Sequence, residues 1–281
     1  EALILQLILN LTNVGLNLLF VVGMDMGVKG VALGTLIAEW GAAILGVYFL
    51  VKILGFKQLQ ESFCSSQLFH FNEFQKIMIL NGFIFVRTLL LMTAFVIVMR
   101  VAGSIGEAEM AASHVMMQFN LLMSLGLDGF AHAGEALAGG AYGMKRKLFF
   151  MKWVYLTSLW ALIASGFYSL FFFYFGADIT TFLTDIDSVR KNVGANLWVI
   201  TLLPIVAVWS YLFDGIFIGA TQGKAMMITM ALSFGVYLFS LSIFTPHGGL
   251  EGLWIAVLIF LGSRGLFQAI YMPFLLKNLK T

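Results

Sequence analysis

The run IMILNGFIFVRTLLLMTAFVIVMRV at residues 77–101 is long and apolar enough to cross the hydrocarbon core of a membrane. A helical span needs about 20 predominantly apolar residues. A backbone inside a bilayer must satisfy its own hydrogen bonds, and this run is too long for a barrel strand. We therefore predict a transmembrane α-helix here.

Seven comparable runs lie elsewhere in the chain, separated by polar or turn-forming stretches. With the first run included, the predicted spans are residues 3–22, 28–51, 77–101, 111–138, 149–175, 193–220, 225–244 and 250–276. The sequence thus predicts an all-α integral membrane protein with eight transmembrane helices.

The composition supports this fold class and excludes others. Of the 281 residues, 60% are hydrophobic and 11% are charged, whereas soluble domains are about 25% charged. This excludes a soluble enzyme, a nucleic-acid binder and a disordered chain. The sequence contains no nucleophile elbow and no P-loop, and His132 with Glu135 is too little for a zinc site. We therefore expect no enzymatic activity, no cofactor, no metal and no nucleic-acid partner.

Basic residues between the spans or at their ends indicate orientation, because cytoplasmic loops of membrane proteins are enriched in Lys and Arg. Ten lie on one side of the predicted spans and four on the other. Since both ends of the chain fall on the richer side, we place both termini in the cytoplasm and the protein in the inner (plasma) membrane. The richer side carries Lys52, Lys57, Lys76, Lys145, Arg146, Lys147, Lys152, Lys224, Lys277 and Lys280, and the poorer side Lys29, Arg100, Arg190 and Lys191.

One short pattern occurs twice. The stretch GVKGVALG at residues 27–34 opens the second span, and GLEGLWIA at residues 249–256 opens the eighth. Either two helices start alike by chance, or the chain repeats with a period of six helices, as transporters built from parallel repeats do. The second alternative, together with an apolar start that lacks Met, leads us to expect four further helices upstream of Glu1.

Six charged side chains fall well inside the predicted spans, away from the span ends, where each costs at least about 2.5–3.5 kcal/mol unless it has a partner, water or a function. Even if both bases pair with acids, two acids remain unmatched. A buried carboxylate without a partner can take up a proton near neutral pH, as a proton or cation site requires. The acids are Glu39, Asp128, Glu135 and Asp214, and the bases are Arg87 and Arg264.

The fourth span concentrates these groups on one helical face. Asp128, His132 and Glu135 stand at positions i, i+4 and i+7 and therefore point the same way. They form either a functional face, with His132 as a hydrogen-bond neighbour of the carboxylates, or a polar face that packs against another helix.

The sixth span contains Pro204, which permits a kink, and Tyr211 one turn before Asp214. Asp214 is either a cation or proton site or the partner of an arginine. Arg87 and Arg264 most simply neutralise acids from other spans. Glu39 lies among small residues that let helices approach closely, so we expect it to have a structural pairing role.

These stretches resemble the DinF-like members of the MATE (multidrug and toxic compound extrusion) family. The resemblance covers essentially the whole chain and rests on LDGFAHAGEALAGGAYG at residues 127–143, LPIVAVWSYLFDGIFIGAT at 203–221, LGSRGL at 261–266 and Arg87 with Leu89 and Leu90. The family has twelve helices in two lobes. The resemblance thus implies the last two helices of the N-terminal lobe at 1–52, a cytoplasmic inter-lobe linker at 53–76 and a complete six-helix C-terminal lobe at 77–281.

The resemblance further implies a secondary antiporter that works by alternating access. Small organic or cationic compounds would leave as protons or sodium ions enter, with the bilayer as the other partner and a monomer as the full-length state. We expect Asp128 and Asp214 to converge, and at least one of them to be protonated during part of the cycle. The alternatives are a lipid-linked oligosaccharide flippase of the same superfamily, which would favour a cationic cavity, and a membrane receptor or channel without exchange.

Overall fold

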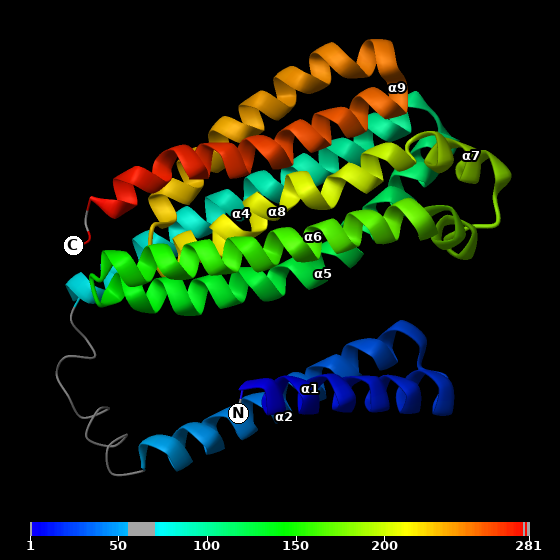
Figure 1. The fold of residues 1–281 in the computed structure, drawn as a ribbon. Helices are drawn as coiled ribbons and strands as arrows, with labels where there is room; N and C mark the ends of the chain where they lie inside the picture. The colour runs from blue at the N-terminus through cyan, green and yellow to red at the C-terminus, as the bar shows by residue number, and fades with distance from the viewer. Residues whose placement is uncertain (1, 56–70, 278, 280–281) are drawn as a thin grey trace. The chain divides into compact units, whose positions relative to one another are not determined.

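The computed structural model describes residues 2–55, 71–277 and 279, which are helical almost throughout and contain no β-strand (Figure 1). The all-α membrane fold predicted from the sequence is therefore confirmed. The chain divides into two compact units, Glu1–Phe74 and Gln75–Thr281, and each is described by itself. Most of the predicted linker, residues 56–70, lies outside the described residues.

The first unit contains a helical hairpin. Helix α1 (Ala2–Asn17) continues into a single π-helical stretch, η1 (Leu18–Gly23), and α2 (Gly27–Leu54) packs back against both. The buried positions of α2 fall on every fourth residue, so one small-residue stripe faces its partner helix. This stripe consists of Gly30, Gly34, Ala38 and Ala42.

The second unit is a bundle built around α8. Its helices are α4 (Phe71–Ile105), α5 (Glu107–Gly143), α6 (Lys147–Leu183), α7 (Asp187–Ala195), α8 (Leu197–Gly219) and α9 (Gly223–Leu276). Helix α8 packs against α5, α6 and α9 and buries most of its length. Large aromatic side chains fill the surrounding core, and the rings of Phe119 and Phe172 meet edge to face at 5.2 Å.

Two buried aromatic residues with a polar group are hydrogen-bonded within this core. Tyr237 donates to the carbonyl of Ala94 at 3.2 Å, and the indole of Trp254 donates to Ser113 at 3.3 Å. Both bonds join α9 to an earlier helix. They provide acceptors for the Tyr237 hydroxyl and the Trp254 indole N–H, which would otherwise be buried without a hydrogen bond.

Helix α9 contains the last two predicted spans, and Figure 1 shows its two arms folding back on one another. The predicted spans leave a gap at residues 245–249, whereas helical geometry is interrupted only at Gly249 (φ 54°, ψ −125°). Glycine alone adopts this backbone region without strain.

A second correction concerns the end of the fifth span. The predicted span ends at residue 175, but α6 continues to Leu183 and the separate helix α7 follows before the next span. Asp178 is exposed on the surface of α6, where its carboxylate can be hydrated, so the helix continues through it. Arg190 of α7 donates to the carbonyls of Thr184 and Thr181 at 2.8 and 3.1 Å, and so satisfies acceptors at the end of α6.

The two stretches that share a sequence pattern also share a backbone conformation. Gly27 and Gly249 both have positive φ, 53° and 54°. Three residues later, Gly30 and Gly252 lie against Phe20 and Phe244 of the preceding helical segment, where a Cβ atom would be tightly packed at Gly30 and would collide at Gly252. In both places a glycine with positive φ stands three residues before a glycine that packs against the preceding helical segment, as a repeat would produce.

Six helical stretches among the described residues are long and apolar enough to cross a membrane, with α9 counted as one. Helix α5 is as long but falls outside this set, because polar side chains lower its hydropathy. The second unit therefore combines the apolar helices α4, α6, α8 and α9 with the more polar helix α5.

Candidate functional site

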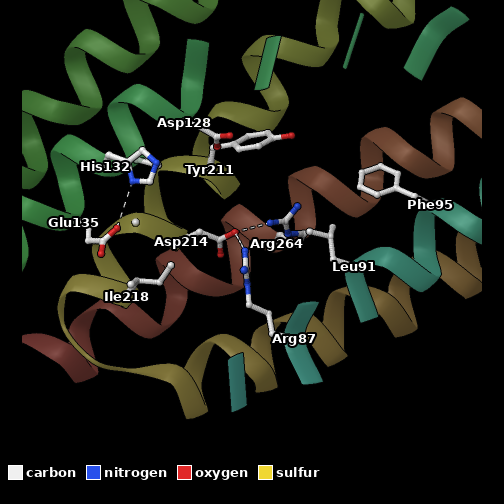
Figure 2. Close-up of a pocket in the computed structure, with 12 residues that line it drawn as sticks. Arg87, Leu91, Phe95, Asp128, His132, Glu135, Tyr211, Asp214, Ile218 and Arg264 are labelled. Carbon is white, nitrogen blue, oxygen red and sulfur yellow. Dashed lines mark hydrogen bonds and ion pairs between the residues drawn. The ribbon is translucent and has the colours of Figure 1, made fainter. Parts of the chain in front are cut away.

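A cavity of about 330 Å³ opens within the second unit, between α4, α5, α8 and α9 (Figure 2). Every charged residue that we predicted within the spans of this unit lines it. Its walls are formed by Arg87, Leu91, Phe95, Asp128, Ala131, His132, Glu135, Tyr211, Asp214, Gly215, Ile218 and Arg264.

Asp214 lies at the centre of a buried ion cluster that joins three helices. Arg87 of α4 and Arg264 of α9 both donate to its Oδ2 atom, Arg264 at 2.6 Å. Gln268, one turn after Arg264, donates to Oδ1 at 2.6 Å. Both carboxylate oxygens are thus bonded. Because these are charge-assisted bonds in a low dielectric, they hold α4, α8 and α9 together at one point.

The two arginines differ in depth. The side chain of Arg264 is 4% exposed and its guanidinium lies 5.7 Å from the ring centre of Phe260, whereas the side chain of Arg87 is 13% exposed. The Nε atoms of both are buried and have no hydrogen-bond partner among the described residues. The cluster therefore holds more donors than it satisfies.

The opposite wall carries the carboxylates of α5. Figure 2 shows Asp128 beside the ring of Tyr211, and His132 and Glu135 on the same side of the cavity. The Nδ1 atom of His132 lies 3.6 Å from Oε2 of Glu135, and both side chains are well exposed, at 80% and 39%. Among the described residues, neither Asp128 nor Glu135 bonds to an arginine.

A very close crossing of α5 and α8 brings these walls together. Gly215 and Gly219 of α8 lie directly against the carbonyls of Ala131 and Glu135, and Gly139 of α5 lies against Gly219. A Cβ atom at any of the three glycines would overlap backbone of the other helix. This small-residue contact sets the separation between the acids of α5 and Asp214.

Two further contacts hold α8 in place. A Cβ atom on Gly265 of α9 would lie 2.6 Å from Cβ of Trp209, so these helices also touch closely. Helix α8 runs through Pro204, which lacks an amide donor. Near this gap, Ser169 of α6 donates to the carbonyl of Thr201 at 2.7 Å, as neighbouring helices do around membrane prolines.

The structure thus brings together most of the predicted site residues. Asp128, His132, Glu135, Tyr211, Asp214, Arg87 and Arg264 all line one cavity. Pro204 is buried in α8 but does not line the cavity. Glu39 is exposed on α2, and no ion pair with it is found in residues 2–55.

Sequence reasoning did not include Gln268 among the site residues. Its position four residues after Arg264 was the available signal, since such residues share a helical face. Sequence reasoning also left out the apolar lining residues Leu91, Phe95 and Ile218, which resemble any other membrane-embedded side chain.

Comparisons with known proteins identify the relatives of the chain. The MatE family model matches residues 84–243. The chain is 31% identical over 273 residues to DNA damage-inducible protein F of Escherichia coli, covering 95% of this chain and 57% of that protein. It is 23% identical to the chloroplastic Protein DETOXIFICATION 44 of Arabidopsis thaliana, covering 91% and 47%. The chain therefore spans about half the length of the curated relatives that it matches.

Solved structures share the fold. The Vibrio cholerae MATE transporter VcmN in its bent form superposes with a TM-score of 0.79 at 19% identity, over 97% of this chain and 61% of that one. A MOP superfamily transporter from Pyrococcus furiosus, described as having a binding pocket of reverse polarity, gives a TM-score of 0.84 at 17% identity, over 100% and 63%.

Proposed function

Because this chain belongs to the MatE family of multi-pass membrane proteins, we propose that it forms part of a secondary active antiporter. In this proposal the second unit is the six-helix C-terminal lobe, and α1 and α2 are the last two helices of the N-terminal lobe. Small organic or cationic compounds leave by alternating access while protons or sodium ions enter.

The polarised cavity is the observation that carries this proposal. Three acids and two arginines line it, together with apolar side chains. An amphipathic cation can place its apolar body against these side chains and its charge near Asp128 and Glu135. The coupling cation competes for the same carboxylates, so binding of the coupling cation opposes binding of the amphipathic compound.

The charge at the two ends of the bundle supports a cytoplasmic C-terminus. The connection between α5 and α6 carries Lys145 and Arg146, and Lys224 opens α9. Figure 1 shows these connections at the same end of the second unit as the C-terminus. A cytoplasmic position of this end in the inner (plasma) membrane follows the positive-inside rule.

The charge balance also separates the proposal from a lipid-linked oligosaccharide flippase. Such a protein must bind a diphosphate, for which a cavity with a net positive charge is suited. Here the acids exceed the arginines by one, and both arginines are bonded to Asp214. The geometry therefore favours cation exchange.

Transport into proteoliposomes under an imposed gradient tests the proposal. The intact protein is reconstituted, and uptake of the cationic dye ethidium is followed with a proton gradient, a sodium gradient or neither. We expect one gradient to drive uptake, and Asp128→Asn or Asp214→Asn to reduce the driven rate at least tenfold. Asp178→Asn, an exposed carboxylate outside the cavity, is the matched control.

Two outcomes would overturn the proposal. If both cavity variants transport at the wild-type rate with unchanged pH and sodium dependence, these carboxylates are structural. If ions cross the membrane without any exchanged solute, the protein is a channel and not an antiporter.

A further inference from the structure

The cluster of Arg87, Arg264 and Asp214 has a local net charge of +1, although the cavity as a whole holds one more acid than arginines. Two guanidinium groups converge on the same carboxylate oxygen, and the remaining donor to Asp214 is the neutral amide of Gln268. An uncompensated charge in a buried site is costly, and a second counter-charge relieves that cost.

The other acids of the cavity do not supply this counter-charge by contact. Glu135 pairs with His132. In Figure 2, Asp128 lies beside Tyr211, and Asp214 lies between Asp128 and Arg87. Among the described residues, the only ion-pair partner of either arginine is Asp214.

Arg87 is the better placed of the two arginines to meet a ligand. Its side chain is the more exposed, and it lines the cavity with Leu91 and Phe95. These three residues stand at positions i, i+4 and i+8 of α4, so they form one stripe along the helix. A charged group is thus followed by two apolar ones on a single wall.

We propose that this stripe is an anion subsite, which binds the carboxylate of an apolar organic acid at Arg87 and its apolar body against Leu91 and Phe95. The carboxylate arrives either on a transported compound or on a separate ion bound beside it. Only the transported compound rests on the proposed antiporter function, because a separate ion can bind without being transported.

Binding of benzoate to the intact protein in detergent tests the subsite. Benzylamine, with the same ring and the opposite charge, is the matched probe, and ligand-induced thermal stabilisation gives the apparent Kd. We expect saturable stabilisation by benzoate and at least a tenfold weaker Kd in Arg87→Gln, the scale of one hydrogen bond to a charged group. Arg100→Gln removes an exposed arginine of α4 outside the cavity and should leave the Kd unchanged.

Two further variants keep the test decisive if Arg87→Gln folds poorly. Arg87→Lys retains the charge and should bind benzoate within a few-fold of wild type. Asp214→Asn removes the existing counter-charge, so benzoate should bind this variant at least threefold more tightly and stabilise it more than wild type. A merely structural role for the cluster predicts the opposite effect of Asp214→Asn.

The subsite is refuted if benzoate fails to bind, or if Arg87→Gln and Asp214→Asn bind it as wild type does. Counterflow of radiolabelled benzoate in proteoliposomes separates the two sources, since exchange identifies a transported acid and its absence a co-bound ion. If benzoate binds but ethidium is not transported under any gradient, the antiporter proposal fails and the subsite stands.

Discussion

The two walls of the cavity hold the same chemical group in opposite environments. On α8, Asp214 is buried and receives bonds at both oxygens from three residues of two other helices. On α5, Asp128 and Glu135 are both half-buried, and among the described residues neither is bonded to an arginine. A saturated carboxylate binds helices together, whereas an accessible one can exchange ligands, so we expect stability to depend on the first wall more than on the second.

Removal of Asp214 is the largest perturbation that this comparison predicts. Asp214→Ala leaves two guanidinium groups buried without a partner and should lower the free energy of unfolding by about 3–5 kcal/mol. Asp128→Ala should lower it by less than about 1 kcal/mol. Titration of each purified variant with SDS measures both values, and similar losses at the two positions would show that the walls do not differ.

Gly219→Ala tests whether the spacing of the walls depends on the close crossing of α5 and α8. The new methyl group would overlap the carbonyl of Glu135, and overpacking of this kind costs about 1–3 kcal/mol. Gly140→Ala is the matched control, since no atom of another helix lies within 4 Å of the position that its methyl group would take. The same SDS titration compares them, and equal stability would mean that the crossing adapts freely.

Ser169→Ala tests whether a contact from α6 stabilises α8, the wall of the cavity that carries Asp214. This change removes the bond to the carbonyl of Thr201 next to Pro204 and should cost about 1 kcal/mol. Hydrogen exchange of amides in α8 near Pro204 should accelerate in the variant. Unaltered exchange would show that Ser169 does not stabilise the turn before the proline.

The smallest effect is expected on the α5 wall. His132→Ala removes an exposed partner of Glu135, and a solvated pair of this kind contributes less than about 0.5 kcal/mol. The thermal unfolding temperature should therefore change little, while ethidium transport reports any functional role of the histidine. A stability loss comparable to that of Asp214→Ala would contradict the assignment of this wall as accessible.

Sequence alone could place the elements of this site but not their partners. Long apolar runs indicate membrane spans, so the sequence predicted the helices that carry Arg87, Asp128 and Asp214. The stripe of Asp128, His132 and Glu135 follows from helical periodicity. The scarcity of charge in the spans also indicated that the arginines neutralise acids from other helices.

The convergence of both arginines on one acid could not be predicted, because it depends on how three helices pack. One determinant of this packing is the close contact of Gly265 in α9 with Trp209 in α8, and a glycine in a membrane helix does not reveal which helix it faces. Helix α7 was missed for a different reason: its nine residues are polar and carry no apolar run. The break at Gly249 was placed correctly, but the helical continuation through Pro246 was not.

The Asp214 cluster also constrains how the protein is assembled during synthesis. Arg87 precedes Asp214 by 127 residues, and Arg264 follows it by 50. Since helices reach the membrane in the order of translation, Arg87 enters first and the second arm of α9 enters last. Until that arm arrives, Asp214 lacks both Arg264 and Gln268. The segment that carries Arg264 and Gln268 therefore completes the polar cluster, and a nascent chain interrupted before it exposes unmatched polar groups to membrane quality control.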